Sequence, residues 1–334
     1  MSKTGPCPIR KTSVPAAGGG WQSLGRISRS DVDCVHSLSC GQTFSWGRLR
    51  DGSWIGVVGS AAYRIFPEEE SYSVEGLQGS RQALLDYFSL SVPWRQIVRD
   101  LPSDPVLAEA RAAGEGIRIL DQDPWEALAS FLCSPVKPIP EIRRITWRLR
   151  SKWGISIAGS RLFTFPTPQA LAVAGREELL EHRLGFRARS LQAVARVVAE
   201  DPAFFSRLRA QPTCEARARL CELPGVGAKI ADCVLLFGLG RYDSFPIDVW
   251  MERLLRKLYF PRQGGVSARK IAEFAAAHFG PYGGYAQQLL YFWYRRSEGR
   301  NPARELDLSL EEEARLALPA FRPRPAVRRR CASP

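Results

Sequence analysis

Residues 223–229, Leu-Pro-Gly-Val-Gly-Ala-Lys, combine a glycine-rich turn with a lysine. Gly225 and Gly227 would allow a tight turn between two helices, because a side chain there would block close backbone approach. This turn, with Val226 at its centre, would leave free amides at the start of the second helix, where an anion such as a DNA phosphate binds. Lys229 would stand one step inside that helix, and burial that favours its neutral amine would make it a nucleophile.

A second candidate, Asp248, lies nineteen residues after Lys229. It precedes an apolar stripe at helical spacing, formed by Met251, Leu254, Leu255 and Leu258. This pattern predicts an aspartate that caps the N-terminus of a helix. An anion-binding hairpin, an amine nucleophile and a fixed carboxylate together indicate chemistry on DNA.

The composition favours a polyanionic partner. Lys and Arg number 47 against 34 Asp and Glu, a formal charge of +13, although several arginines fall in a Pro-rich C-terminal tail. The eight cysteines include no CxxC pair, which argues against a zinc ribbon, a four-cysteine iron–sulfur cluster and a disulfide framework. Because the three histidines are also dispersed, we expect no metal and no organic cofactor.

The sequence predicts neither a membrane span nor a secretion signal. No apolar run approaches the roughly 18 residues that a membrane span needs. The first twenty residues lack an apolar signal core, although their lack of acidic residues leaves an organelle transit peptide open. The expected compartment is the cytoplasm or nucleoid of a bacterium, or the nucleus of a eukaryote.

The chain changes from strand to helix patterning along its length. Residues 21–72 read as short strands, with Asp51-Gly52 marking a hairpin turn, whereas apolar residues from Ser80 to about residue 300 recur at helical spacing. We therefore predict an α+β fold, in which an antiparallel β domain precedes a mostly helical domain. The predicted units are a disordered tail (1–20), a β domain with helices (21–118), a helical domain (119–300), and a short helix (308–318) with a Pro/Arg-rich tail (301–334).

The hairpin and the later Ile-Asp-Val resemble the helix-hairpin-helix DNA glycosylases with a Gly/Pro-rich loop and an aspartate (HhH-GPD). The lysine is typical of the bifunctional members, which also cut the strand. Residues 39–46, Ser-Cys-Gly-Gln-Thr-Phe-Ser-Trp, resemble a motif of the 8-oxoguanine glycosylases, which carry an N-terminal β domain. Further similar motifs follow in the expected order: 85–88, 121–124, 184–189 and 280–282.

This resemblance implies base excision repair of double-stranded DNA that contains an oxidised purine, by a monomer. The nucleotide would be flipped out of the duplex. Lys229 would attack C1′ and form a Schiff base, and β-elimination of the 3′ phosphate would follow. Asp248 would stabilise the oxocarbenium-like charge as the glycosidic bond breaks.

The resemblance also implies a pocket for the flipped base. The carbonyl of Gly41 would accept from the N7–H that 8-oxoguanine has and guanine lacks. Gln287 would read the Watson–Crick edge. Tyr291 would stack on one face of the base, and Cys233 would cover the other.

Three further residues would contact the DNA. Phe186 and Arg187 would fill the gap left by the flipped nucleotide and contact its orphaned partner base. Lys137 would contact phosphate, in compensation for a family histidine that Trp250 replaces here.

The chain departs from the family where the opposing base is read. Eukaryotic members carry three asparagines after a Cys-Ser pair, whereas here residues 135–138 are Pro-Val-Lys-Pro, and Glu141 aligns with a family arginine. Only Arg187 of the three cytosine-reading groups would remain. We therefore expect weak discrimination among the bases opposite the lesion.

Two alternatives stay open at this point. An alkylpurine glycosylase shares the β domain and the aspartate, but that family lacks the lysine. A catalytically silent DNA-binding protein could use the same hairpin and would form no reducible Schiff base.

Overall fold

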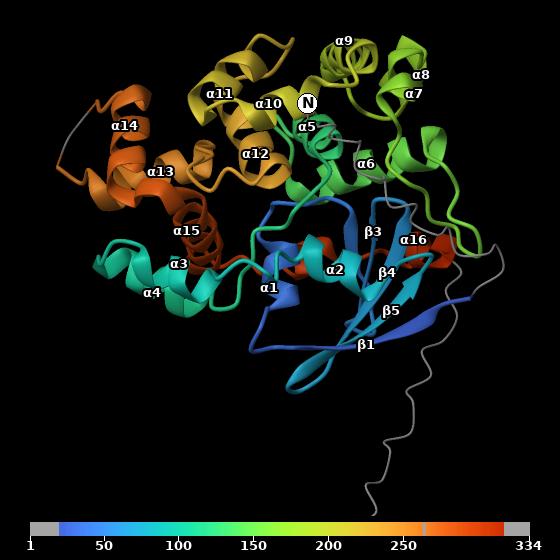
Figure 1. Ribbon diagram of the computed structural model, residues 1–334, viewed down its shortest axis with the longest axis horizontal. Helices are drawn as coiled ribbons and strands as arrows, with labels where there is room; N and C mark the ends of the chain where they lie inside the picture. Colours follow the sequence, from blue (N-terminus) through green and yellow to red (C-terminus); the bar gives the residue numbers. More distant parts are fainter. Residues whose placement is uncertain (1–19, 263–264, 317–334) are drawn as a thin grey trace, which may run out of the picture.

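The computed structural model describes residues 20–262 and 265–316. The predicted N-terminal tail, apart from Gly20, and the Pro/Arg-rich tail lie outside the described residues. Within them, a β-sheet formed by the N-terminal part of the chain packs beneath a group of helices (Figure 1). The predicted α+β class is confirmed.

The sheet has five antiparallel strands. In spatial order they are β1 (Gln22–Ser28), β5 (Ser71–Leu77), β4 (Ala61–Pro67), β3 (Trp54–Val58) and β2 (Trp46–Arg48). Gly52 adopts φ +84° in the turn between β2 and β3, which confirms the hairpin predicted at Asp51-Gly52. Trp46, Trp54 and Tyr63 are fully buried in the core of this domain.

The strand pattern over residues 21–72 includes residues 43–46, whose polarity alternates, but of these four residues only Trp46 lies in a strand. Strand β2 begins only at Trp46. Thr43 and Ser45 point into a buried polar contact with each other (Oγ1–Oγ, 3.0 Å), and Thr146 Oγ1 donates to the carbonyl of Phe44 (3.2 Å). The carbonyl of Ser45 still accepts from the amide of Val57 in β3 (3.3 Å), whereas the carbonyl of Phe44 is bound by the helical domain.

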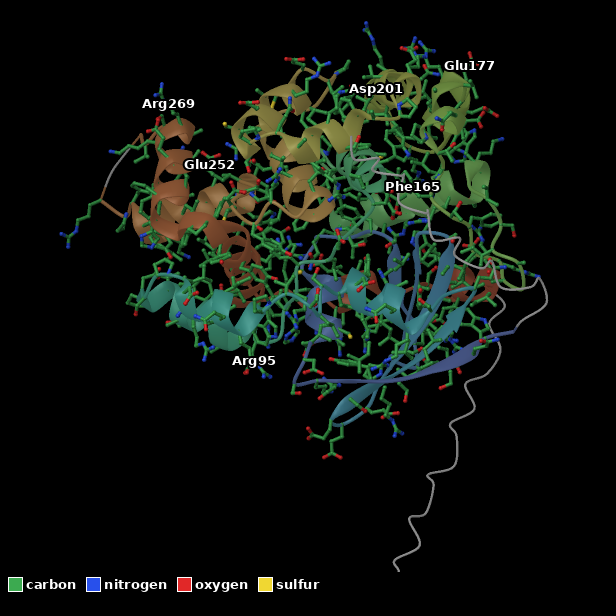
Figure 2. The ribbon with its side chains drawn as sticks, in the orientation of Figure 1. Arg95, Phe165, Glu177, Asp201, Glu252 and Arg269 are labelled. Carbon is green, nitrogen blue, oxygen red and sulfur yellow. The ribbon has the colours of Figure 1, made fainter. Side chains whose placement is uncertain are left out.

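Four short helices come before residue 114 of the chain: the first two pack with the sheet, and the next two pack in the core of the helical domain. Twelve elements follow in the helical domain. The first four are α1 (Cys34–Ser39), α2 (Arg81–Tyr87), α3 (Trp94–Asp100) and α4 (Pro105–Ala113). The later ones are α5 (Pro124–Leu132), α6 (Ile139–Trp153), α7 (Pro168–Ala172), α8 (Arg176–Glu181), α9 (Arg187–Glu200), α10 (Phe204–Ala210), α11 (Thr213–Cys221), α12 (Ala228–Leu239), α13 (Val249–Tyr259), α14 (Ala268–Phe279), the 3-10 turn η1 (Gly280–Tyr282) and α15 (Gly283–Ser297). In Figure 1, α15 runs between α13 and the α3–α4 pair. Arg95 and Arg269 project at the periphery of this assembly (Figure 2).

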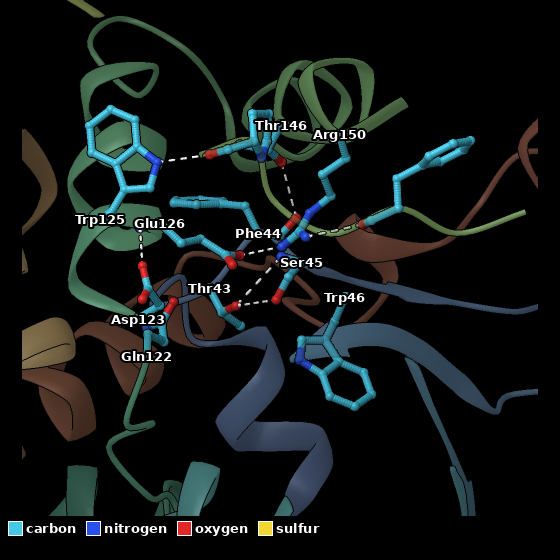
Figure 3. A network of polar contacts seen from close by, with 12 residues as sticks. Thr43, Phe44, Ser45, Trp46, Gln122, Asp123, Trp125, Glu126, Thr146 and Arg150 are labelled. Carbon is cyan, nitrogen blue, oxygen red and sulfur yellow. Dashed lines mark hydrogen bonds and ion pairs between the residues drawn. The ribbon is translucent and has the colours of Figure 1, made fainter. Parts of the chain in front are cut away.

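A polar network within the helical domain lies beside the segment that precedes β2. Arg150 of α6 forms an ion pair with partly buried Glu126 of α5 and donates to the carbonyl of Phe163 (3.3 Å). Trp125 Nε1 donates to the carbonyl of Pro166 (2.8 Å). Figure 3 shows this network beside residues 43–46. It fixes the segment that precedes β2 against α5 and α6.

The chain returns to the sheet at its C-terminal end through η2 (Arg304–Leu306) and α16 (Leu310–Leu316). The amide of Leu308 donates to the carbonyl of Arg48 (2.8 Å), and Arg143 Nη2 lies 3.3 Å from Glu312 Oε1. The helix predicted at 308–318 is present but begins two residues later, at Leu310, and the last two predicted residues lie outside the described ranges. No helix in those ranges is long and apolar enough to cross a membrane.

Candidate active site

The glycine turn joins α11 to α12, as the sequence predicts for a helical hairpin. Gly225 adopts φ +81°, and a Cβ there would lie 2.5 Å from Ser190 Oγ, so this position requires glycine. The side chain of Val226 is buried in the core, so that only its backbone can serve the predicted DNA contact. Gly227 is the N-cap of α12, and a Cβ there would meet no described atom within 4 Å. Glycine at this position therefore leaves space for a ligand to approach the start of α12.

Lys229 is the second residue of α12 and is half-buried. Its Nζ donates to Ser134 Oγ (3.4 Å) and lies 4.8 Å from the centre of the Phe131 ring. Ser134 Oγ in turn donates to the carbonyl of Phe131 (2.7 Å). The amine is thus held at the start of a helix, beside an aromatic face and a single hydroxyl.

Asp248 is the N-cap of α13, as predicted. Its Oδ1 accepts from the amide of Met251 (2.8 Å). Asp248 and Lys229 both line one cleft of about 710 Å³. The structure therefore brings the two predicted catalytic residues together.

Most of the predicted base-binding and DNA-binding residues line the same cleft. Those on its wall are Gly41, Lys137, Gly227, Cys233, Gln287 and Tyr291. Among the described lining residues, Phe186, Arg187, Gly225 and Val226 are absent. The predicted base-pocket residues thus all line one cavity, whereas Phe186 and Arg187, predicted to fill the gap in the duplex, do not line it.

Gly41 and Tyr291 are in close contact across the cleft. A Cβ at Gly41 would lie 3.1 Å from Tyr291 Cε1 and 3.1 Å from Ile139 Cδ1, and the residue adopts φ +81°. Only glycine allows this approach of the 40–42 backbone to the tyrosine ring. The Gly41 carbonyl and the ring thereby border the same space.

Cys233 lies one helical turn after Lys229 and is buried on the cleft wall. The pKa of its thiol is raised to about 12, chiefly because the thiolate is poorly solvated when buried; Lys229 opposes this rise, and the Asp248 carboxylate contributes to it. Burial and the Asp248 carboxylate likewise raise the pKa of the Tyr291 hydroxyl. The Asp248 carboxylate therefore affects the groups at both predicted faces of the base pocket, and the Cys233 thiol and the Tyr291 hydroxyl both stay neutral near pH 7.

Because the Cys233 thiol stays protonated at neutral and mildly alkaline pH, we expect it to resist alkylation in the folded protein. Exposed Cys214 and Cys221 should react with iodoacetamide at pH 8, and Cys233 should stay unmodified until the chain is denatured. Peptide mass mapping of native and denatured samples distinguishes these sites. Rapid native modification of Cys233 would contradict the buried, neutral thiol.

Two apolar side chains, one that lines the cleft and one outside it, are exposed. Phe186 is 72% exposed, consistent with the predicted wedge, and Val136 is 95% exposed. Val136 adopts φ +55°, a strained conformation for a β-branched residue. Arg187 donates from Nη1 to the carbonyl of Leu184 (3.1 Å) and from Nη2 to the carbonyl of Pro135. Arg187 therefore fastens the 134–138 loop beside Phe186.

Basic side chains near this loop are in contact with an acidic residue and an aromatic residue. Glu141 lies 4.0 Å from Lys137, 3.6 Å from Arg144 and 3.9 Å from Arg183. Lys137 is thus partly neutralised before any phosphate arrives. Trp250 lines the cleft, and the guanidinium carbon of Arg300 lies 4.8 Å from its ring centre.

Sequence reasoning missed several residues of the site, among them Phe131, Ser134, Gln288, Arg295 and Glu305. Gln288 and Arg295 share a helix face with Gln287 and Tyr291, so helical spacing was an available signal. Glu305 forms an ion pair with Arg295 from the C-terminal segment, which no local pattern predicts. The guanidinium of Arg295 lies 5.4 Å from the centre of the Tyr291 ring.

Comparison with known proteins identifies the family. Residues 26–128 match the 8-oxoguanine DNA glycosylase N-terminal domain, and residues 140–277 match the HhH-GPD superfamily of base excision DNA repair proteins. An N-glycosylase/DNA lyase from Saccharomyces cerevisiae is 31% identical over 264 residues, which cover 70% of each chain. The chain belongs to the 8-oxoguanine DNA glycosylase family.

Solved structures agree with this assignment. MBOgg1, in a complex with a low-affinity DNA ligand, is 34% identical with a TM-score of 0.76, covering 85% of this chain and 98% of that one. The 8-oxoguanine glycosylase/lyase of Clostridium acetobutylicum, bound to double-stranded DNA with cytosine opposite 8-oxoguanine, is 29% identical with a TM-score of 0.74. That comparison covers 81% of this chain and 93% of the Clostridium chain. The predicted family, rather than an alkylpurine glycosylase, is confirmed.

Proposed function

We propose that this 8-oxoguanine DNA glycosylase/lyase carries out base excision and strand cleavage with Lys229 and Asp248. The observation that supports this assignment most directly is that both side chains line one cleft with the predicted base-pocket residues. A duplex base is out of reach of such a cleft, so the damaged nucleotide must be flipped into it.

In the first step, Lys229 Nζ bonds to C1′ while the bond from C1′ to the base nitrogen breaks, and the base leaves with that electron pair. Positive charge that builds on the sugar is stabilised by the Asp248 carboxylate. Opening of the sugar ring gives a Schiff base. Loss of a C2′ proton then expels the 3′ phosphate and cuts the strand.

Recognition of the base follows from the cleft walls. We assign the Gly41 carbonyl to the N7–H of 8-oxoguanine and the Gln287 amide to its Watson–Crick edge. The flat ring of Tyr291 and the neutral thiol of Cys233 border the cavity as the two faces of the base slot. Undamaged guanine would present a lone pair to the Gly41 carbonyl and be rejected.

We also propose that the protein discriminates weakly among the bases opposite the lesion. The 135–138 segment carries no amide side chain, and Glu141 stands where the family has an arginine. Arg187, the remaining candidate reader of cytosine, already donates to the carbonyls of Leu184 and Pro135. These two bonds tie the guanidinium to the protein and leave fewer of its five N–H donors for cytosine.

An excision assay on four duplexes tests this proposal, with 8-oxoguanine placed opposite C, A, G or T. Single-turnover rates opposite C should exceed the others by less than about a hundredfold, since each good base contact contributes ~1–3 kcal/mol. A matched duplex with undamaged guanine should stay intact. A larger preference for C would refute the weak discrimination, and cleavage at guanine would refute the assigned substrate.

The remaining expectations stay proposals about the intact chain. We propose that it acts as a monomer, because a single lesion in one strand has no symmetry for an oligomer to match. We place its activity where DNA is kept, in the nucleoid or the nucleus.

A further inference from the structure

One face of α15 forms a wall of the cleft. Gln287, Gln288, Tyr291 and Arg295 all line the cavity, and their spacing keeps them on one side of the helix. Gln287 is 5% exposed, Gln288 2% and Arg295 3%. Burying three polar side chains beside a ligand cavity is costly unless each finds a partner there.

The Gln288 side-chain amide has a hydrogen-bond partner for its nitrogen but none for its oxygen among the described residues. Its Nε2 donates to Gln287 Oε1 (2.5 Å). Its own Oε1 is buried and accepts no hydrogen bond from the described residues. A buried carbonyl oxygen without a partner costs free energy, so an orphaned acceptor beside a binding cavity points to a ligand donor.

The two amides together match one edge of a guanine-type base. That edge presents, in order, the O6 acceptor, the N1–H donor and the exocyclic 2-amino donor. Because Gln288 donates to Gln287 Oε1, the Gln287 amide is oriented with its Nε2 hydrogens available to O6. The second lone pair of Gln287 Oε1 remains for N1–H. The next donor along the edge, the 2-amino group, then meets the orphaned acceptor of Gln288.

We propose that Gln288 is a further specificity-determining residue of the base pocket. Its Nε2 fixes the orientation of the Gln287 amide, and its Oε1 accepts a hydrogen bond from the 2-amino group of the flipped base. This inference rests on the proposed function, since it takes 8-oxoguanine as the base. Adenine-type bases present an amino donor at position 6 and lack the 2-amino group, so the paired amides also select against them.

The test removes the 2-amino group from the substrate and the acceptor from the protein. Wild-type protein and the Gln288→Met variant are compared on duplexes that carry 8-oxoguanine or 8-oxohypoxanthine, which differ only in that amino group. Gln288→Met should lower the single-turnover rate on 8-oxoguanine about tenfold. The same substitution should lower the rate on 8-oxohypoxanthine less than about threefold, because that base loses only the orientation of the Gln287 amide and has no 2-amino hydrogen bond to lose.

Two controls separate recognition from folding. Buried Gln122, which donates to the carbonyl of Gln42 outside the cleft, provides the matched variant Gln122→Met, and its effect should be equal on both substrates. Cleavage of a duplex with a preformed abasic site should be unchanged in Gln288→Met, because that substrate has no base to read.

The outcomes are distinct. Equal losses on the two bases, or no loss on either, would overturn the role of Gln288. If the wild-type chain cuts the abasic duplex but leaves 8-oxoguanine intact, the proposed function fails before any variant is compared.

Discussion

Replacement of Lys229 by glutamine is expected to abolish covalent trapping of the protein on DNA. Wild-type protein incubated with an 8-oxoguanine:C duplex and sodium borohydride should form a stable adduct, because the reductant fixes the Schiff base. Glutamine keeps a polar side chain of similar length but has no nucleophilic amine. We expect no adduct and a fall in base excision of roughly a thousandfold or more.

Lys137→Gln is the matched control, since Lys137 lines the same cleft but is paired with Glu141 at 4.0 Å. That variant should still form the adduct, with a loss confined to DNA affinity. A preformed abasic duplex should trap the wild type and Lys137→Gln but not Lys229→Gln. An adduct that persists in Lys229→Gln would assign the nucleophile to another amine.

The positions of the proposed catalytic pair were predictable because the signals for them are local in sequence. A glycine turn, a lysine one step into a helix and an aspartate before an apolar stripe each follow from residue spacing alone. The structure places Lys229 and Asp248 on one cleft and confirms that Asp248 caps α13. Capping needs only the amide of Met251, three residues away, so short-range sequence determines it.

Features that depend on distant partners were not predictable. The role given to Arg187 followed from its position next to Phe186, yet its guanidinium is held by the carbonyls of Leu184 and Pro135, the latter from another loop. The strand pattern at residues 43–46 likewise did not reveal that the carbonyl of Phe44 accepts from Thr146 in α6. Polar groups choose among partners that only the tertiary fold brings within reach.

Asp248→Asn should separate the two roles of this residue. Asparagine caps a helix about as well as aspartate, so the amide of Met251 keeps its acceptor. The free energy of unfolding should therefore change by less than about 1 kcal/mol. Asparagine is neutral, however, and cannot stabilise positive charge on the sugar, so single-turnover excision should fall about a hundredfold to a thousandfold.

A matched cap elsewhere in the chain completes the comparison. Asp123 caps α5 by accepting from the amide of Glu126 (2.9 Å), and it lies outside the set of described residues that line the cleft. Asp123→Asn should leave excision within about twofold of wild type while testing the same cap chemistry. The two variants should have similar thermal unfolding midpoints. Only Asp248→Asn should have a lower excision rate, and its affinity for the duplex should change little, because the lost interaction acts in the transition state. Equal excision rates in both variants would show that Asp248 acts only as a helix cap and does not stabilise positive charge on the sugar.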